Sequence, residues 1–328
     1  MSLAISEEKP LLEVKDLKKY YPVKTGWLSR KTGYVRAVDG LSFSVNRGET
    51  LGIVGESGSG KTTLGQMILQ LQEPTGGEVW FDQRKLTGMS GKALRHVRAD
   101  LQLIFQDPYA SLNPRMKIKD IIAEPLIIRG ETEGLQLRKR ISELMEIVGL
   151  REHHLNRYPH EFSGGQRQRI GIARALSLNP KLIVCDEAVS ALDVSIQAQI
   201  LNLLKRLQKE YQLTYIFIAH GLASVKFVSE HIAVMYLGRI VEMGQKDALF
   251  ARPKHPYTKS LLSSIPVSHP RETKERILLK GDIPSPINPP SGCSFHTRCP
   301  MAQDICKSQI PVFEQHTDKH GVACHFPM

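Results

Sequence analysis

The sequence predicts an α/β fold with a parallel sheet at its centre and a smaller extension at its C-terminal end. The first observation is a glycine-rich loop, residues 55–62, between an apolar run and a helical pattern. The second is a pair of apolar runs, residues 182–185 and 213–219, each followed by polar side chains. The third is a change of composition beyond Phe250, where prolines and then cysteines gather. With 328 residues, these features favour one large domain plus an appendage.

The glycine-rich loop has the sequence Gly55-Glu56-Ser57-Gly58-Ser59-Gly60-Lys61-Thr62, which fits G-x-x-x-x-G-K-[ST] at every fixed position. Thr50–Val54 before it is typical of a buried strand, and Thr63–Leu69 after it is typical of a helix. In that context the backbone N–H groups and the helix start favour bound phosphate. The loop therefore predicts a nucleoside triphosphate site in which Lys61 reaches the β- and γ-phosphates and Thr62 binds Mg²⁺. The alternative is a Gly/Ser-rich turn with a chance lysine, which the flanking strand and helix disfavour.

Two later strands end in polar side chains. The apolar run Lys181–Cys185 is typical of a buried parallel strand and ends in Asp186 and Glu187. Because α/β sheets bind ligands at the carboxyl ends of their strands, Asp186 is expected to hold Mg²⁺ and Glu187 to deprotonate an attacking water. The alternative is a pair of surface acids that cap the next helix. The strand Leu213–Ala219 ends at His220, a position that favours a γ-phosphate sensor over a structural histidine.

The segments around these strands carry weaker patterns. Leu12–Leu17 and Val38–Val45 alternate apolar and polar residues and predict an antiparallel sheet, with an exposed loop over Lys24–Arg36. Residues 118–178 predict a mostly helical region. Within it, Ser163-Gly164-Gly165-Gln166 predicts a second helix start able to bind phosphate, with an ordinary capped helix as the alternative.

Charge and hydropathy limit the choice of partners. The formal net charge is +11, but no dense Lys/Arg block is interleaved with aromatic residues, so a solvated basic surface is favoured over nucleic-acid binding, with proximity to acidic lipid head groups as the second interpretation. The first ten residues lack the pattern of a signal peptide, and no apolar run is long enough to span a bilayer. We therefore expect a cytoplasmic protein whose membrane role, if any, comes through a partner.

The cysteines gather in the C-terminal tail. The proline-rich segment Ile283–Pro290 is expected to be an extended connector, and Cys185 a small buried apolar side chain. In a cytosolic protein, clustered cysteines favour metal over disulfides, and four thiolates suit zinc or an iron–sulfur cluster. The tail has no C-x-x-C pair, and its histidines keep a mixed Cys/His site open. The residues concerned are Cys293, Cys299, Cys306 and Cys324, with His296, His316, His320 and His325.

Six motifs occur in a fixed order, and with them the sequence resembles an ABC transporter ATPase subunit over nearly the whole chain. The motifs are residues 55–62, Gln106, Phe162–Gln166, Asp186-Glu187, Ser190–Asp193 and His220. The resemblance implies an ABC-type P-loop NTPase fold over residues 1–254, with a RecA-like core, an antiparallel β subdomain and a helical subdomain at about residues 107–178. Residues 255–328 would form the small Cys-rich extension.

The resemblance also implies roles for individual residues. Glu187 would be the general base, His220 the switch histidine, and Gln106 the link between Mg²⁺ and a membrane partner. ATP would be hydrolysed between the P-loop of one subunit and the signature, Phe162–Gln166, of another. Gly221 follows His220 where such proteins more often have Asp, and this puts the behaviour of that loop in doubt. The residues expected around the nucleotide are Tyr21 (or Tyr20), Gly55, Glu56, Ser57, Gly58, Ser59, Gly60, Lys61, Thr62, Thr63, Ser163, Gly164, Gly165, Gln166 and Asp193, with Thr62, Gln106 and Asp186 on Mg²⁺.

The His255-Pro256-Tyr257 segment and the tail are similar to the C-terminal region of the oligopeptide/dipeptide/nickel importer subfamily, F-type ATPase subunit. That resemblance implies a 4Fe-4S cluster on the four tail cysteines, with zinc as the alternative. It implies a paralogous ATPase subunit, two permeases and an extracytoplasmic substrate-binding protein as partners, at the cytoplasmic face of the plasma membrane. Import of di- or oligopeptides is expected, with nickel or another small solute as the alternative. A soluble, non-transport ABC ATPase is disfavoured because the chain has one cassette and no long coiled-coil insertion.

Overall fold

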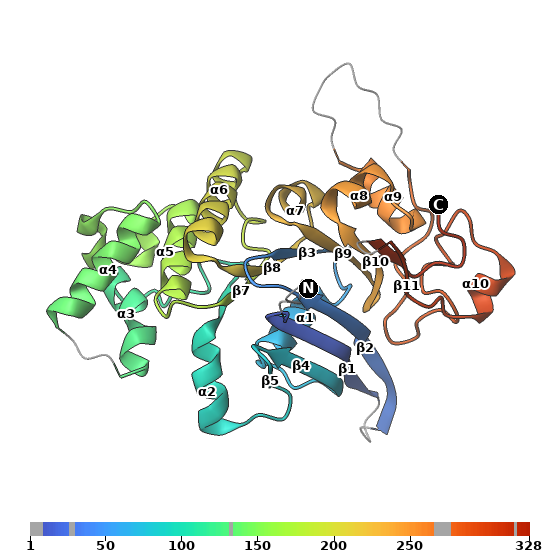
Figure 1. The fold of residues 1–328 in the computed structure, drawn as a ribbon, viewed down its shortest axis with the longest axis horizontal. Coiled ribbons are helices and arrows are strands. Elements are labelled where there is room, and N and C mark those ends of the chain that lie inside the picture. The colour runs from blue at the N-terminus through green and yellow to red at the C-terminus, as the bar shows by residue number, and fades with distance from the viewer. Residues whose placement is uncertain (1–8, 26–29, 131–133, 266–276, 318–319) are drawn as a thin grey trace, which may run out of the picture. The chain divides into compact units, whose positions relative to one another are not determined.

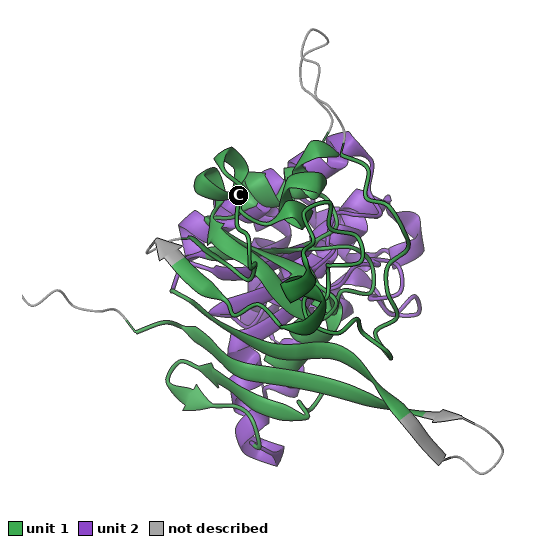
Figure 2. Ribbon diagram, turned by 90° about the vertical axis from the view of Figure 1, so that its right-hand side faces the viewer, with its two compact units in different colours: residues 1–46, 50–88, 219–328 green, residues 47–49, 89–218 purple. Residues whose placement is uncertain are grey.

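A computed structural model describes residues 9–25, 30–130, 134–265, 277–317 and 320–328. The chain forms two compact units, which Figure 2 colours separately. Unit 1 consists of residues 1–46, 50–88 and 219–328, and unit 2 of residues 47–49 and 89–218. Among the described residues, no helix combines the length and apolar character needed to cross a bilayer.

Unit 1 contains an antiparallel sheet in the order β2-β1-β4-β5 (Figure 1). Its strands are β1 (Leu12–Thr25), β2 (Arg30–Val45), β4 (Gly76–Phe81) and β5 (Arg84–Lys85). The predicted alternation is confirmed, because Leu12, Val14 and Leu17 are buried. A register shift after Val14 keeps Leu17 on the buried face.

The prediction of an exposed loop over Lys24–Arg36 was wrong for the described residues of that range, and residues 26–29 lie outside the described part of the chain. Lys24 and Thr25 continue β1, residues 30–36 begin β2, and Val23 pairs with Gly33. The two strands satisfy each other's backbone hydrogen bonds, which need no particular side chains. A stretch rich in glycine and lysine can therefore extend a hairpin although its composition is typical of a loop.

The other strands of unit 1 are neighbours in the order β11-β12-β10-β9-β3. β3 (Thr50–Val54) lies parallel to β9 (His231–Tyr236), and β10 (Arg239–Gln245) returns antiparallel to β9. β12 (His320–Val322) pairs with β10, and β11 (Glu314–Thr317) pairs with β12. The helices are α1 (Lys61–Ile68), α7 (Leu222–Val228), α8 (Lys246–Ala251), α9 (Pro256–Ser263) and α10 (Asp304–Ser308).

Unit 2 contains three parallel strands in the order β8-β7-β6, namely β8 (Thr214–Ala219), β7 (Leu182–Asp186) and β6 (Leu101–Ile104). Residues 182–185 and all of β8 are buried, which confirms the prediction of buried parallel strands. The predicted helical region contains α3 (Ile118–Ile128), α4 (Leu135–Ile147) and α5 (Gly164–Leu176), with short 3₁₀ helices at Glu152–Asn156 and Pro159–Glu161. α2 (Gly91–Asp100) and α6 (Val194–Tyr211) complete the unit.

The C-terminal segment is fixed to β10 through one buried carboxylate. Glu242, which is fully buried, accepts hydrogen bonds from the backbone N–H groups of Lys254 (2.7 Å) and His255 (2.9 Å). The ring of His320, on β12, donates from Nε2 to the same carboxylate (2.7 Å). Glu242 thus ties together β10, the segment before α9, and β12.

Helix α5 packs closely on α6 at its first turn. A Cβ atom added to Gly165 would lie 2.4 Å from Cγ2 of Ile196, whereas one added to Gly171, in the same helix, would meet nothing within 4 Å. Gly165 is therefore required by packing, and Gly171 is not.

We expect Glu242→Ala to lower the free energy of unfolding by about 3 kcal/mol, because it leaves buried donors without an acceptor. Urea unfolding followed by circular dichroism would measure this. Asp304→Ala is the control, since it removes only an exposed ion pair with Lys307 and should leave the free energy of unfolding nearly unchanged. Equal losses for the two variants would contradict the assignment.

Within α5, alanine should act in opposite directions at the two glycines. Gly165→Ala should destabilise the chain by about 1–3 kcal/mol through the clash with Ile196. Gly171→Ala should stabilise it by about 0.5–1 kcal/mol, because alanine has the higher helix propensity. Thermal unfolding of both variants would test this, and a destabilised Gly171→Ala together with a neutral Gly165→Ala would overturn the packing argument.

Candidate functional site

The loop Gly55–Thr62 connects β3 to α1 in unit 1 and closes around a lysine. Lys61, the first residue of α1, is 4% exposed. Its Nζ donates hydrogen bonds to the backbone oxygens of Gly55 (2.8 Å) and Glu56 (3.0 Å). The predicted strand–loop–helix arrangement is present, and the amine lies inside the curve of the loop.

Neighbouring backbone fixes the path of this loop. A Cβ atom at Gly55 would lie 2.3 Å from the carbonyl oxygen of Met235, on β9, and one at Gly60 would lie 2.0 Å from that of Ala37, on β2. Gly60 also has φ of +98°, a left-handed conformation that favours glycine. The N–H of Gly238 donates to the carbonyl of Ser59 (3.0 Å). Gly55 and Gly60 are therefore required by close contacts, and Gly60 also by its backbone conformation.

Two residues of the C-terminal segment contact the loop, and the sequence singled out neither for this role. Arg298 donates two hydrogen bonds to the carboxylate of Glu56, from Nη1 to Oε2 (2.7 Å) and from Nη2 to Oε1 (3.1 Å). The hydroxyl of Tyr257 accepts from the backbone N–H of Glu56 (3.0 Å). The only sequence signal was the His-Pro-Tyr segment, since nothing links position 56 to position 298.

In unit 2, two predicted residues meet at the carboxyl ends of neighbouring strands. Gln106 follows β6, and its Nε2 donates to Oε2 of Glu187, which follows β7 (2.6 Å). Glu187 is 5% exposed, and its backbone N–H donates to the carbonyl of Ile218 (2.9 Å). Its φ of +49° turns the chain sharply after Asp186, the last residue of β7. The carboxylate is thus held by an amide that fixes its orientation.

The segment Ser163–Gln166 forms the predicted helix start. Ser163 is exposed and caps α5, because its hydroxyl accepts from the N–H of Gln166 (3.4 Å) while the Gln166 side chain accepts from the N–H of Ser163 (3.1 Å). Asp193 likewise caps α6, accepting from the N–H of Ile196 (3.0 Å) and the hydroxyl of Ser195 (2.8 Å). These hydrogen bonds lower the pKa of Asp193, the one from Ile196 most strongly.

The two neighbouring tyrosines of β1 have different surroundings. The Tyr20 hydroxyl donates to Asp39, which also pairs with Arg239 (2.6 Å). Burial, reinforced by Asp39, raises the pKa of Tyr20 to about 12. The Tyr21 hydroxyl instead bonds Gln72, and its ring lies 5.2 Å from the amine of Lys19. Both hydroxyls are thus bound within unit 1, and the stacking of Tyr21 on a base stays a prediction.

His220 directly follows β8 and is exposed. Gly221 caps α7 with φ of −88°, a conformation open to any residue, and an added Cβ would meet only the Ser224 hydroxyl at 3.7 Å. The backbone here therefore has no need of glycine, so the doubt that Gly221 raised does not extend to the shape of the loop.

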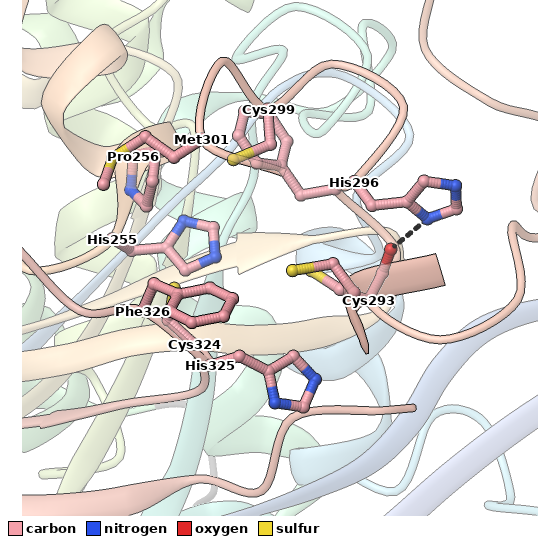
Figure 3. A pocket seen from close by; sticks show the side chains of 11 residues that line it. His255, Pro256, Cys293, His296, Cys299, Met301, Cys324, His325 and Phe326 are labelled. Carbon is pink, nitrogen blue, oxygen red and sulfur yellow. Dashed lines mark hydrogen bonds between the residues drawn. The ribbon is translucent and has the colours of Figure 1, made fainter. Parts of the chain in front are cut away.

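The four tail cysteines line one pocket in unit 1 (Figure 3). Cys293 and Cys299 lie on one segment, Cys306 is in α10 and Cys324 follows β12, and Phe295 and Phe326 also line the pocket. Burial, with smaller contributions from the other three thiols, raises the pKa of Cys293 to about 11. All five cysteines are free, and Cys185 is buried in β7, in unit 2. The structure therefore brings together Cys293, Cys299, Cys306 and Cys324.

Three histidines near this pocket each have one ring nitrogen in a hydrogen bond, and two of them, His296 and His325, line it. The Nδ1 of His296 contacts the carbonyl of Cys293 (2.9 Å), the Nε2 of His325 contacts that of Gln309 (2.9 Å), and His320 pairs with Glu242. In the described part of the chain, no group of three or more His, Cys, Asp or Glu side chains is arranged to hold a metal ion. Neither the four thiols alone nor a mixed Cys/His set is thus arranged as a metal site among the described residues, and the side chain of His316 lies outside them.

Comparison with known proteins agrees with this arrangement. Residues 38–190 match the family described as ABC transporter, and residues 241–306 match the oligopeptide/dipeptide transporter, C-terminal region. The oligopeptide transport ATP-binding protein AppF of Bacillus subtilis is 52% identical over 98% of this chain and 99% of its own length. The dipeptide transport ATP-binding protein DppF of Haemophilus influenzae is 50% identical over 99% of each chain.

Comparison with a solved structure also supports the ABC transporter family. The ATP-binding cassette MJ0796, a dimer in a post-hydrolysis state with ADP and Pi, matches with a TM-score of 0.64 and 32% identity, over 72% of this chain and 98% of its own. The predicted ABC-type fold is confirmed over that part. The chain belongs to the ATP-binding subunits of ABC transporters, and it carries the C-terminal region found in oligopeptide/dipeptide transporters.

Proposed function

We propose that this ATPase subunit energises an importer of di- or oligopeptides. The observation that carries the proposal is similarity at about half of all positions, along the whole chain, to ATP-binding proteins named for oligopeptide and dipeptide transport. These names, together with the C-terminal region, favour peptides over nickel and disfavour a soluble, non-transport ATPase. The partners would be a paralogous ATPase, two permeases and an extracytoplasmic substrate-binding protein, at the inner face of the membrane.

For ATP, we infer that the loop 55–62 binds the phosphates. Lys61 would exchange its hydrogen bonds to Gly55 and Glu56 for the β- and γ-phosphate oxygens, which are stronger acceptors. Thr62 and Asp186 would hold Mg²⁺, which neutralises charge on the phosphates. Tyr21 would stack on the adenine.

Hydrolysis would depend on Glu187. Its carboxylate would take a proton from water as the water oxygen attacks the γ-phosphorus, and the bonding electrons would leave with the oxygen of ADP. Gln106 supports this role, because its hydrogen bond fixes the carboxylate. His220 would contact the γ-phosphate. The phosphates would also meet Ser163–Gln166 of the second ATPase subunit, as expected for a site shared between two subunits.

For the cysteine pocket, we infer a 4Fe-4S cluster. Its support is the convergence of four thiols on one apolar pocket. The described residues contain no group of three or more His, Cys, Asp or Glu side chains arranged to hold a metal ion, so binding would require the four thiols to move. Four thiolates suit a cluster, and zinc is the alternative that they would also hold. When bound, it would cross-link a segment that has little regular structure of its own.

Coupling to peptide import is the test of the whole proposal. The chain, purified from membranes with its permeases and second ATPase, should hydrolyse ATP faster when a peptide-loaded binding protein is added. Glu187→Gln should lower turnover by about 10²-fold or more while ATP binding persists, since only proton abstraction is lost. Stimulation by nickel and not by peptides would contradict the proposed cargo. Unchanged turnover in Glu187→Gln would contradict the assigned base.

Metal analysis is the test for the pocket. Anaerobically purified chain should contain about four iron atoms and absorb visible light through thiolate-to-iron charge transfer. Cys299→Ser should lower the iron content, whereas Cys185→Ala, outside the pocket, should leave it unchanged. One zinc and no iron would exclude the cluster.

A further inference from the structure

Glu56, the second residue of the loop Gly55–Thr62, is held at three points. Its carboxylate receives two hydrogen bonds from Arg298, and its backbone N–H donates to the Tyr257 hydroxyl. Its carbonyl oxygen accepts from Lys61, the lysine inside the loop. Two of these three contacts come from the C-terminal extension. The position of Glu56 thus depends on a segment that is more than 200 residues away in sequence.

The Arg298–Glu56 pair is well shielded from solvent. The Arg298 side chain is 8% exposed and that of Glu56 is 25% exposed. The guanidinium carbon lies 5.9 Å from the centre of the Tyr236 ring, and that ring packs on Tyr257 (4.8 Å) and Phe295 (5.2 Å). A bidentate pair in such surroundings is more specific than a surface ion pair, and its loss leaves a carboxylate without a counter-charge.

The segment that carries Arg298 also carries two of the pocket cysteines. Backbone hydrogen bonds run from His296 to Cys293 (3.0 Å), from Arg298 to Phe295 (3.0 Å) and from Cys299 to His296 (3.4 Å). These turns fix Arg298 relative to both thiols. Tyr257 is connected to the same pocket, because its backbone N–H donates to Nδ1 of His255 (3.1 Å), which lines it.

We propose that Arg298 is a positioning residue that couples the cysteine pocket to the phosphate-binding loop. It neutralises the carboxylate of Glu56, and with Tyr257 it holds the loop open for phosphate. The inference rests on ATP binding at residues 55–62, as proposed above. A change at the cysteines that shifts the turns between Cys293 and Cys299 is thereby transmitted to the loop and changes its affinity for ATP.

ATP binding to the purified full-length chain tests the role of Arg298. Calorimetry is done in a Glu187→Gln background, which prevents hydrolysis. Arg298→Gln should weaken ATP binding about 10-fold, since it leaves the Glu56 carboxylate to repel the phosphates. Arg298→Lys should recover part of the affinity by restoring the charge. Lys307→Ala, which removes a basic residue of the same extension that pairs with exposed Asp304, is the control and should bind as tightly as the parent.

A double-mutant cycle separates the pair from a general loss of structure. Glu56→Gln removes the charge that Arg298 neutralises, so Arg298→Gln should have little further effect in that background. An Arg298→Gln effect that is equally large in the parent and in the Glu56→Gln background would overturn the proposal. If Arg298→Gln does not fold, Tyr257→Phe provides the same test, because it removes only the acceptor for the Glu56 N–H and should weaken ATP binding about 3-fold. Unchanged affinity in the variant that is tested would also overturn it.

A second double-mutant cycle tests the coupling between the cysteine pocket and the phosphate-binding loop. Cys299→Ser should weaken ATP binding when Arg298 is present, and much less in the Arg298→Gln background. Equal losses in both backgrounds would show that the pocket acts by another route, and would refute the coupling. Parent chain that binds no ATP would refute the proposed nucleotide site itself. Parent chain that binds ATP, with Arg298→Gln equal to it, would refute this inference alone.

Discussion

The loop that begins at Gly55 keeps its shape because backbone carbonyl groups of two neighbouring strands lie directly against two of its glycines. The carbonyl oxygens of Met235 and Ala37 occupy the space in which a side chain at Gly55 or Gly60 would lie. β9 and β2, which carry these carbonyls, therefore define the path of the loop without any ligand. Such preorganisation lowers the ordering cost of binding phosphate. The pairing of β3 with β9 matters for function because it places one of these carbonyls.

The C-terminal extension is fixed to the rest of unit 1 at two carboxylates. Glu242 receives backbone and histidine N–H groups, and Glu56 receives a guanidinium. Between these anchors the segment has little regular structure, and its proline-rich connector forms no helix or strand in its described part. A segment of this kind has a small core of its own, so the pairing of β12 with β10 and these two carboxylates together fix where it lies. One of the two carboxylates lies in the nucleotide loop, which gives the extension access to the ATP site.

Much of the site followed from local patterns in the sequence. The spacing of glycines and lysine predicted the loop, and two apolar strands with polar ends predicted that Glu187 and His220 directly follow buried parallel strands, whereas Gln106 came from the family resemblance. These features depend on neighbours in sequence or on the periodicity of a single strand. The common pocket of four cysteines followed from residue type and from a family resemblance.

What the sequence did not reveal depends on long-range pairing. Arg298 and Tyr257 contact Glu56 only after the chain has folded. Neither lies in a sequence motif from which a contact with Glu56 could be predicted. The short strands β11 and β12 have too few residues to show an alternating pattern. The extension of β1 to Thr25 and the start of β2 at Arg30 were missed because the two strands are stabilised by each other's backbone, whereas the composition of this stretch is that of a loop.

The segment Ser163–Gln166 shows how far folding alone explains a motif. Gly165 is required because Ile196 packs against it, and Gln166 completes the cap with Ser163. Both residues therefore have a structural reason inside unit 2. Gly164 does not, since an added Cβ would meet only the tip of the Leu192 side chain at 3.2 Å, which can move. The proposed contact with the nucleotide of a second subunit is thus best tested at Ser163, which is exposed, and at Gly164, because the fold itself does not dictate that glycine.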